Sequence, residues 1–438
     1  MDSRPPVGRP VITVGLLGLG VVGSGVARAL ADKRAAIEAH VGRAVAIGRV
    51  LVRDEAKTRD DPPDLRLTVD PDDILKDPDV DIVVEVMGGV DPALSYIQRA
   101  LHAGKHVVTA NKEVMAKHGP EVLAHALEHG VSIRFEASVG GGIPIIGPLM
   151  NDLAANEVTA VNAVINGTTN YMLTRMADDG ISYDEALAEA KALGYAEADP
   201  SADVDGVDAA FKLAVLSSLA FRTSIKDTDV YREGIAKLAP VDFTYAAELG
   251  YAIKLLATGK RVGNDVQVRV HPAFLPWDNP LAKVDGVYNA VELEGDLVQW
   301  AMFQGPGAGA EPTASAVLGD LLAVARNVAT GAPAPSSLSL DAGLSVQPMD
   351  QLDTKYYLRL RAHDRPGVMA QITKVLGDLG VSLASVIQKE VHAEDLAEIV
   401  ITTHKARESS VQQAVSELEA LDVVMEVSNL VRVEDGAR

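Results

Sequence analysis

The 438-residue chain contains no cysteine, and none of its apolar runs approaches the roughly 20 residues that span a lipid bilayer. The lack of cysteine excludes disulfide bridges, zinc sites built on thiolates and a cysteine nucleophile. The stretch MDSRPPVGRP has no apolar centre of the kind found in secretory signals, and we expect residues 1–10 to form a loose tail. These absences suit a cytoplasmic location.

Positive charge is scarce relative to negative charge, with 40 Lys and Arg against 61 Asp and Glu and a net charge of -21. Extended contact with nucleic acid or with an anionic membrane is therefore not expected. Apolar residues make up 47% of the chain and charged residues 23%, the balance of a soluble globular protein of two or three domains. No repeat with a period of about 20–50 residues is present.

The segment VITVGLLGLGVVGSGVARALAD predicts a buried strand over Val11–Leu17, a glycine turn and a helix over Val22–Asp32. The turn fits G-x-G-x-x-G, which lets a pyrophosphate approach backbone amides at a helix N-terminus. We interpret it as a dinucleotide-binding turn, with a tight strand–helix turn lacking any ligand as the alternative. The expected cofactor contacts are Gly18, Leu19, Gly20, Val21, Val22 and Gly23.

A second strand is predicted over residues 44–54, and it ends with Arg53 followed by Asp54. An acid at this position usually meets the ribose of NAD, whereas an arginine meets the additional phosphate of NADP. Because Arg53 comes first, NADP is favoured and NAD stays possible. The alternative is a solvated ion pair at a strand end.

Strand–helix alternation continues, with a strand in residues 80–89, an amphipathic helix over 93–104 and a further strand that ends before Lys112. Such alternation predicts an α/β fold with a doubly wound parallel sheet. Ligands of these sheets lie beyond the C-terminal ends of the strands. Lys112 is therefore a candidate site residue, although a lone lysine in a loop is usually only solvated.

The next segments predict a change of domain near Glu136. The glycine-rich bend of residues 139–144 has freely turning backbone, whose carbonyls could face a cation. After it, VTAVNAVINGTTNYML predicts a strand up to Ile165, a turn at Asn166 and Gly167, and a helix capped by threonine.

An acidic loop follows and leads into a helix that starts near residues 205–207. Within that helix Asp208 and Lys212 are four residues apart and share one face. The usual outcome of this spacing is a surface ion pair worth a few tenths of a kcal/mol. However, the nine residues after Lys212 carry no charge. A partly desolvated lysine beside a carboxylate could instead exchange a proton with a substrate oxygen.

The lack of cysteine also bears on chemistry, because oxidation of an aldehyde to an acyl group commonly uses a thiol. A dehydrogenase without one most simply interconverts an alcohol and a carbonyl. That reaction needs a nicotinamide, a proton donor and electrostatic stabilisation of the carbonyl oxygen.

These motifs resemble the homoserine dehydrogenases that carry a C-terminal ACT domain. The most specific match is LGYAEADPSADVDGVDAAFK, supported in order by TANKE, FEASVGGGIP and NGTTNYML, and the resemblance runs from Val11 to about Glu434. It implies NAD(P)-dependent interconversion of L-homoserine and L-aspartate 4-semialdehyde, in threonine, methionine and isoleucine biosynthesis. The alternatives are another NADP-dependent reductase of a small carbonyl compound, or an inactive amino-acid sensor. No kinase segment precedes Val11, so aspartokinase activity is not expected.

The resemblance also implies roles for individual residues. Lys212 resembles the catalytic proton donor, with Asp208 beside it and Lys112 as a second site lysine near the nicotinamide. The implied substrate-binding residues are Gly194, Glu197, Asp203 and Asp208, with Glu197 facing the substrate ammonium. The implied structural sodium site comprises Glu136, Val139, Gly141 and Ile143. In a return segment to the nucleotide domain, Gly307 and Gly309 are expected near the cofactor, although Gly305 is not distinguished from them.

The C-terminal part follows a Pro-, Gly- and Ser-rich linker and predicts the order βαββαβ, which resembles an ACT domain. Its HDRPGV turn could present free amides to an amino-acid carboxylate. The implied regulatory residues are His363, Asp364, Pro366 and Gly367. The resemblance implies feedback inhibition by threonine, with a module that only pairs subunits as the alternative, and a homodimer or homotetramer.

The expected organisation is a tail (1–10), a Rossmann-type nucleotide-binding domain (11–140, with a return segment at about 304–330), an α+β substrate and dimerisation domain (141–303), a linker (331–352) and the ACT domain (353–434). The histidines of residues 102–129 show no metal-ligand spacing with a third partner. We therefore expect them to be surface or helix-face residues.

Overall fold

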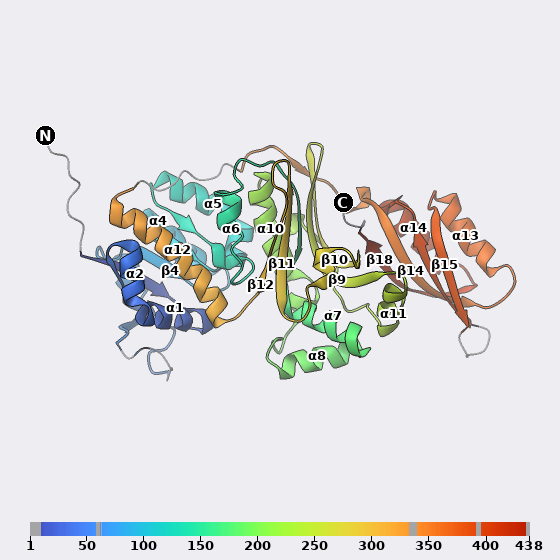
Figure 1. Ribbon diagram of the computed structural model, residues 1–438, viewed down its shortest axis with the longest axis horizontal. Coiled ribbons are helices and arrows are strands. Elements are labelled where there is room, and N and C mark those ends of the chain that lie inside the picture. Colours follow the sequence, from blue (N-terminus) through green and yellow to red (C-terminus); the bar gives the residue numbers. More distant parts are fainter. Residues whose placement is uncertain (1–9, 58–61, 63, 333–339, 391–395, 435–438) are drawn as a thin grey trace. The chain divides into compact units, whose positions relative to one another are not determined.

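The computed structural model describes residues 10–57, 62, 64–332, 340–390 and 396–434 (Figure 1). Most of the predicted tail and part of the predicted linker lie outside these residues. The chain forms two compact units, one with residues 1–161, 211–229 and 288–344, the other with residues 162–210, 230–287 and 345–438. Strand β7 (Val158–Val164) and helix α10 (Val207–Phe221) each contain a point where the chain passes from one unit to the other.

The first unit contains a six-stranded sheet in which every pairing is parallel, in the order β3-β2-β1-β4-β5-β6. This is the strand order of a dinucleotide-binding fold, and it confirms the predicted doubly wound sheet. The strands are β1 (Val11–Leu17), β2 (Ala44–Leu51), β3 (Leu67–Thr68), β4 (Ile82–Glu85), β5 (His106–Thr109) and β6 (Ile133–Arg134).

The longer helices of this unit carry apolar residues on one side, and this side packs in the core. Helices α1, α2 and α12 share one buried cluster with β1, which contributes Ile12, Val14 and Leu16 from one face. Helices α4 and α5 pack against each other. The helices are α1 (Val21–Asp32), α2 (Arg34–Val41), α3 (Asp72–Leu75), α4 (Ala93–His102), α5 (Lys112–Glu128), η1 (Glu136–Ser138), α6 (Ile146–Met150), η2 (Asp227–Asp229) and α12 (Ala310–Thr330).

An antiparallel hairpin, β11 (Tyr288–Gly295) with β12 (Gln299–Pro306), leads into α12. Within this unit α12 returns to the first sheet, where Ala314, Val317 and Leu321 join the buried cluster. The segment that precedes α12 is thereby fixed next to the glycine turn of α1. A Cβ on Gly25 would lie 3.0 Å from the carbonyl oxygen of Ala310, so the two helices approach closely only because residue 25 is glycine.

The second unit contains a mixed sheet with the neighbour order β9-β10-β18-β14-β16-β15. Its elements are α7 (Gly167–Asp179), α8 (Tyr183–Ala192), α9 (Ser201–Val204), β8 (Tyr231–Arg232), α11 (Pro240–Glu248), β9 (Tyr251–Val262), β10 (Asp265–Pro276), η3 (Pro280–Lys283), β13 (Ser345–Val346), η4 (Met349–Gln351), β14 (Asp353–His363), α13 (Val368–Asp378), β15 (Leu383–Glu390), β16 (Leu396–Thr403), β17 (Ala406–Arg407), α14 (Glu408–Glu419) and β18 (Val424–Val433). The predicted βαββαβ order of the C-terminal module is confirmed, with the two-residue strand β17 in addition.

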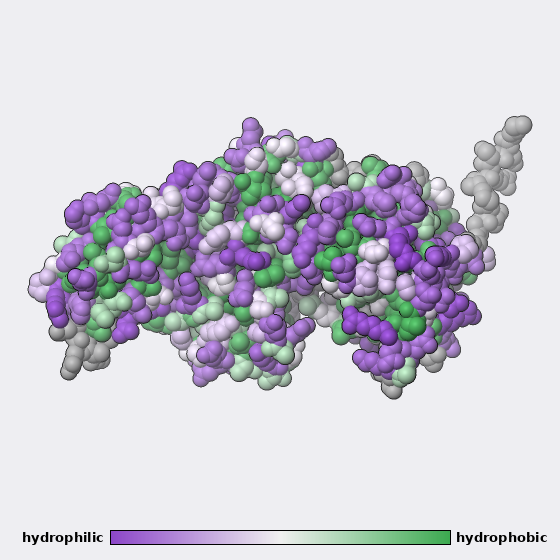
Figure 2. Space-filling model, turned by 180° about the vertical axis from the view of Figure 1, so that it is seen from behind, coloured by the Kyte–Doolittle hydropathy of each residue, from purple (hydrophilic) through white to green (hydrophobic). Residues whose placement is uncertain are grey.

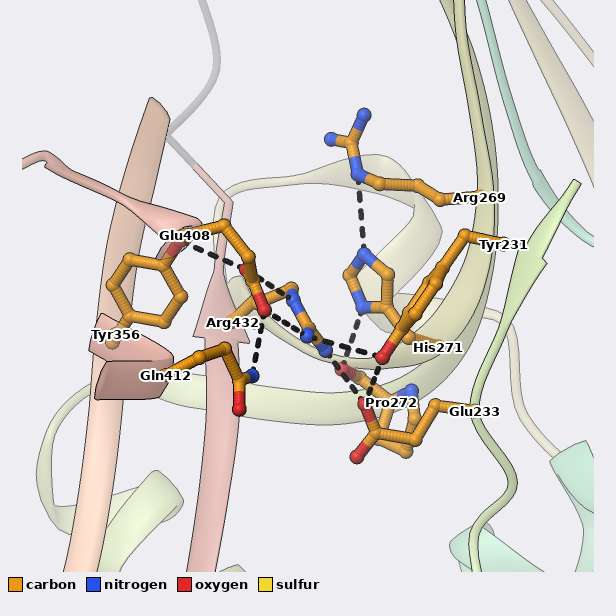
Figure 3. A network of polar contacts seen from close by, with 9 residues as sticks. All are labelled: Tyr231, Glu233, Arg269, His271, Pro272, Tyr356, Glu408, Gln412 and Arg432. Carbon is orange, nitrogen blue, oxygen red and sulfur yellow. Dashed lines mark hydrogen bonds and ion pairs between the residues drawn. The ribbon is translucent and has the colours of Figure 1, made fainter. Parts of the chain in front are cut away.

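A buried ion-pair network attaches the C-terminal module to the rest of the second unit (Figure 3). The guanidinium of Arg432 on β18 is 1% exposed and donates from Nε to Glu408 (2.9 Å) and from Nη1 to Glu233 (2.7 Å). Burial alone would raise the pKa of the Glu408 carboxyl, but the hydrogen bonds and charge of Arg432 outweigh it and lower this pKa. A charged pair so enclosed is costly to break, because either partner alone would be left buried and uncompensated.

One predicted helix cap is wrong. Helix α7 is capped by Asn166 and not by threonine, because Asn166 has extended backbone and its side-chain oxygen accepts from the N–H of Thr169 (2.9 Å). Asparagine is at least as good a cap as threonine. By contrast, the predicted start of the next long helix is confirmed, since α10 begins at Val207.

The face drawn in Figure 2 carries hydrophilic side chains interspersed with smaller hydrophobic areas. Among the described residues, no helix is both long and apolar enough to cross a membrane.

Candidate functional site

A cleft of about 530 Å³ opens at the C-terminal ends of β1, β2 and β4 in the first unit. It is lined by Gly18, Leu19, Gly20 and Arg53, all four of which were predicted to bind the cofactor. The remaining wall is formed by Leu51, Val52, Asp54, Lys57, Val69, Val86, Met87, Pro92 and Tyr96. The mostly apolar wall with a few charged groups at one end is typical of a small-molecule site.

The glycine turn has the geometry that only glycine allows. Gly18 adopts a φ of 104°, and its N–H donates to the carbonyl of Leu51 (3.0 Å). A Cβ on Gly23 would lie 2.2 Å from the carbonyl oxygen of Gly18, so any larger residue would push the helix away from the turn. Val21, Val22 and Gly23 belong to the first turn of α1 and do not line the cleft.

The charged end of the cleft follows β2. Arg53, Asp54 and Lys57 all line it, and the carboxylate of Asp54 accepts the N–H of Ala56 (2.8 Å). Two cations thus lie where the second strand ends, which is the place where a dinucleotide's ribose is recognised in this fold.

Lys112 is the first residue of α5, and the loop before it is held by buried polar contacts. The hydroxyl of Thr109 donates to Glu85 at the end of β4 (2.5 Å), and the amide of Asn111 donates to the carbonyl of Gly89 (2.7 Å). Asn111 also caps α5 by accepting from Val114 (3.1 Å). Burial raises the pKa of Glu85, although its hydrogen bonds oppose this. The half-buried Lys112 is therefore presented at the strand ends from a fixed loop.

Lys212 lies inside α10 and is 8% exposed, so the lysine in the apolar helix is buried as the sequence suggested. Its neighbour Phe211 contacts α5 within the first unit, where the ammonium of Lys117 lies 5.1 Å from the ring centre. This contact brings the helix of Lys112 and the helix of Lys212 together. Asp208, one turn before Lys212, is 5% exposed.

In the second unit, Asn166 joins two of the predicted carboxylates. Its amide nitrogen donates to Asp203 (2.7 Å) and to Asp208 (3.0 Å), while its oxygen caps α7. The single amide therefore fixes the acidic loop against the first turn of α10. The sequence reasoning did not assign Asn166 to the site, and the signal that could have found it is an Asn-Gly turn directly after a buried strand.

The other two predicted substrate residues, Gly194 and Glu197, are exposed. Gly194 follows the C-terminus of α8 with a φ of 76°, which a non-glycine residue would seldom adopt. Between them, the carbonyl of Tyr195 accepts from the hydroxyl of Thr168 (2.7 Å), so the start of the loop is tied to α7.

The residues of the predicted cation site form a buried loop in the first unit. The carboxylate of Glu136 accepts the N–H groups of Ile145, Ile146 and Gly147 (2.5, 2.8 and 2.6 Å) at the start of α6. Gly141 has a φ of 60°. In the part of the chain that the structure describes, the carbonyls of Val139, Gly141 and Ile143 accept no main-chain hydrogen bond.

The predicted return segment packs on this loop. A Cβ on Gly141 would lie 2.5 Å from the backbone of Gly307, and Gly309 is the N-cap of α12 with a φ of 126°. A Cβ on Gly307 would overlap the amide of Asn289, which is fully buried. Neither Asn289 side-chain atom has a hydrogen-bond partner among the described residues.

A second buried carboxyl, Asp320 of α12, holds the loop by accepting the N–H of Glu136 (2.7 Å). Burial raises the pKa of Asp320 to about 7, and the nearby Glu136 charge adds to the effect. The N–H of Glu136 and the more distant Arg134 act in the opposite direction. Sequence reasoning missed this residue because an aspartate in an amphipathic helix is normally solvated.

The predicted regulatory turn lies between β14 and α13. His363 ends β14, Gly367 caps α13 with a φ of 90°, and Asp364 and Pro366 are exposed between them. The N–H of Val368, the first residue of α13, donates to the carbonyl of Arg365 (3.3 Å), which closes the turn.

Three family models match the chain. The model described as homoserine dehydrogenase matches residues 144–322, the model for the homoserine dehydrogenase NAD binding domain matches residues 18–136, and the ACT domain model matches residues 356–423.

Similar proteins cover almost the whole chain. The homoserine dehydrogenase of Neisseria gonorrhoeae is 42% identical, over 97% of this chain and 98% of its own length. The crystal structure of a homoserine dehydrogenase from Thiobacillus denitrificans has a TM-score of 0.92 and 43% identity, over 97% of this chain and 98% of that one. A hyperthermophilic archaeal homoserine dehydrogenase in complex with NADPH has a TM-score of 0.61 and 27% identity, over 72% of this chain and 97% of that one.

Proposed function

Because the chain belongs to the homoserine dehydrogenase family, and is therefore an oxidoreductase that acts on a CH–OH group with a nicotinamide cofactor, we propose that it interconverts L-homoserine and L-aspartate 4-semialdehyde. The observation that carries the proposal is the buried Lys212, one helical turn after the buried Asp208. The reaction would serve the biosynthesis of threonine, methionine and isoleucine in the cytoplasm.

The residues of α10 and its neighbours would handle the proton and the substrate charges. A bound nicotinamide supplies or accepts the hydride. Lys212 donates a proton to the carbonyl oxygen in the reductive direction and removes it in the oxidative direction. Asp208 and Asp203, held by the amide of Asn166, and Glu197 on the exposed loop provide negative charge for the substrate ammonium. Lys112 adds positive charge near the reacting oxygen.

NADP is the preferred coenzyme in this proposal. Arg53 and Lys57 supply two cations at the end of the cleft, and the carboxylate of Asp54 is engaged by the N–H of Ala56. The archaeal relative was solved with NADPH, which supports the same choice. Gly18, Leu19 and Gly20 would meet the pyrophosphate, and Gly307 and Gly309 would lie near the cofactor from the other side.

A sodium ion would fit the buried loop of residues 136–143. Hard cations take oxygen ligands, and the carbonyls of Val139, Gly141 and Ile143 accept no main-chain hydrogen bond in the described chain. The carboxylate of Glu136 already accepts three N–H groups, so its contribution would be mainly to hold the loop. The ion would be structural.

The ACT domain would bind threonine as a feedback inhibitor at the turn containing His363, Asp364, Pro366 and Gly367. The turn leads into the N-terminus of α13, where the helix dipole suits an amino-acid carboxylate. The protein would form a homodimer or homotetramer, and the exposed apolar side chains of the β11–β12 hairpin, Tyr288, Leu297 and Trp300, support a subunit contact.

The activity is tested by following the absorbance of reduced nicotinamide with L-homoserine and NADP, then with NAD. We expect reduction of both coenzymes, with a higher kcat/KM for NADP. L-serine and 4-hydroxybutyrate serve as matched primary alcohols that lack either the chain length or the ammonium. Equal rates with 4-hydroxybutyrate would contradict the role given to the acidic loop, and no reaction with homoserine would contradict the proposal.

Threonine binding is tested by calorimetry on the full chain, with D-threonine as the control and Asp364→Ala as the site variant. We expect heat with L-threonine that the variant reduces. Heat that is equal for the two enantiomers, or no heat at all, would leave the ACT domain with a subunit-pairing role.

A further inference from the structure

Three histidines that are separate in the sequence come together at the C-terminal ends of α4 and α5. His102 is the last residue of α4, His125 lies in the last turn of α5, and His129 follows that helix as its C-cap. One ring nitrogen from each lies within 4.8 Å of the other two. These residues do lie at helix ends and faces as expected, but the expectation that they lack a third partner at metal-ligand spacing is wrong. Two of them are spaced i, i+4 on one helix face, and the packing of α4 against α5 supplies the third.

In two of the three rings, a polar contact engages Nδ1 and leaves Nε2 for a ligand. His129 Nδ1 lies 3.0 Å from the carbonyl of His125, which can only accept, so this nitrogen carries the proton and Nε2 keeps its lone pair. His125 Nδ1 faces the carboxylate of Glu128 at 3.9 Å. Metal-binding histidines typically use their other nitrogen in this way, with a backbone carbonyl or a carboxylate as partner.

The second ring nitrogen of His125 is available to bind a ligand. His125 Nε2 is buried, and it has no hydrogen-bond partner among the described residues. Leaving a buried polar atom unpaired is unfavourable, so a native structure usually gives it a partner. His125 belongs to the cluster, and together with His102 it helps to line a cleft of about 430 Å³.

The charged side chains that line the cleft bear on whether it binds a cation or an anion. Lys76 and Arg99 also line it, but both pair with the carboxylate of Asp72, Lys76 at 2.6 Å. Asp72 therefore compensates one of the two positive charges and engages both cations, and the groups that remain for a ligand are imidazoles. Imidazole nitrogens suit zinc and the neighbouring transition metals, whereas calcium, magnesium and sodium prefer oxygen ligands.

We propose that His102, His125 and His129 form a binding site for a borderline divalent cation, with Zn²⁺ as the main candidate. Three histidines and one open position are a known zinc arrangement. The site lies at the opposite end of α5 from Lys112, about 25 Å away at 1.5 Å per residue, so the ion takes no part in hydride transfer. It joins α4 to α5 and stabilises their packing.

The test uses the full chain, freed of metal by a chelator and titrated with Zn²⁺ by calorimetry. We expect one ion per chain, with binding at least tenfold weaker in His125→Ala and in His102→Ala. The matched controls are His118→Ala on α5 and His40→Ala on α2, which remove histidines outside the cluster and should bind like the native chain. Binding that none of the cluster variants weakens would overturn the proposal, as would no binding by the native chain.

A spectroscopic readout separates ligation from general weakening of the fold. Co²⁺ in a four-coordinate site absorbs visible light far more strongly than hydrated Co²⁺, and we expect such a band in the native chain and the controls only. His102 is exposed, so His102→Ala should keep the native thermal midpoint without metal. Zn²⁺ should raise that midpoint in the native chain and not in His102→Ala. An equal rise in both proteins would place the metal elsewhere and refute the site.

Discussion

The proposed activity depends most on Lys212, a lysine in a helix whose next nine residues carry no charge. Lys212 is buried, and the equally buried Asp208 lies one helical turn before it. We predict that Lys212→Met lowers kcat by about two orders of magnitude or more, because proton transfer to the substrate oxygen loses its donor. Titration with NADPH should give an unchanged Kd.

The control for this variant is Lys226→Met, which removes an exposed lysine that follows the same helix. It should keep both kcat and cofactor affinity. Turnover of Lys212→Met within a few-fold of the native rate would remove Lys212 from the mechanism.

The side-chain amide of Asn166 has two separate roles. Its oxygen caps α7, and its nitrogen donates hydrogen bonds to Asp203 and Asp208. Asn166→Ser keeps a cap acceptor and loses the donor, whereas Asn166→Ala loses both. We predict that both variants raise the KM for homoserine, and that only the alanine variant lowers stability, by about 1 kcal/mol. Steady-state kinetics and denaturant unfolding measure the two effects.

A serine variant with the native KM would show that the acidic loop is positioned without this amide. A serine variant as unstable as the alanine variant would show that capping and positioning cannot be separated at this residue.

For single residues, the sequence predicts site residues that belong to a local motif. It does not predict residues that only tertiary packing brings together. Lys212 and Asp208 could be proposed from an i, i+4 spacing next to an apolar run. Asn166 could be read only as part of a turn, because its partners lie 37 and 42 residues away. The three histidines come together through the packing of two helices, a contact that no local pattern encodes.

The elements around the buried loop of residues 136–147 depend on a carboxyl that burial keeps partly protonated. The pKa of Asp320 is raised from 3.8 to about 7, so between about pH 4 and pH 7 the folded chain holds a proton that the unfolded chain has lost. Stability therefore falls as the pH rises through this window. We predict that Asp320→Asn, which can still accept from Glu136, raises stability at pH 8 by on the order of 2 kcal/mol and has little effect near pH 4.

The measurement is the thermal midpoint of both proteins across pH 4–8, with Asp278→Asn, an exposed aspartate, as the control. Parallel midpoint curves for the native chain and Asp320→Asn would contradict the proton assignment. A variant that is less stable at every pH would show that the carboxylate charge itself supports the loop.

Element boundaries follow from the sequence where a local signal exists. The run of Val11–Leu17 gave β1 with the predicted bounds, and α10 begins at Val207 as predicted. The predicted second strand continues to residue 54, whereas β2 ends at Leu51, because its last residues leave the sheet to form the cofactor cleft. The prediction thus extends a strand into the functional loop, where site geometry overrides local propensity.

Within the second unit, continuous contacts lead from the ACT domain to the acidic loop. Arg432 of β18 pairs with Glu233, and the segment after Glu233 packs on the end of α9. There the N–H of Ile235 donates to the carbonyl of Val204 (3.0 Å), and a Cβ on Gly234 would lie 2.5 Å from the same oxygen. The next residues along the chain lead into Asp208. A shift of β18 on effector binding would therefore reach the carboxylates to which we assign the substrate ammonium.

We predict that Glu233→Ala weakens threonine inhibition, raising the threonine concentration for half inhibition about fivefold, which corresponds to roughly 1 kcal/mol of lost coupling. Arg432 keeps its pairing with Glu408, so the buried guanidinium remains compensated and the ACT domain stays folded. The control is Glu426→Ala, an exposed carboxylate on the same strand that faces Arg361. Inhibition curves and calorimetric threonine affinity, measured on both variants, distinguish lost coupling from lost binding. If Glu233→Ala binds threonine normally and is inhibited as strongly as the control, the signal does not pass through Glu233.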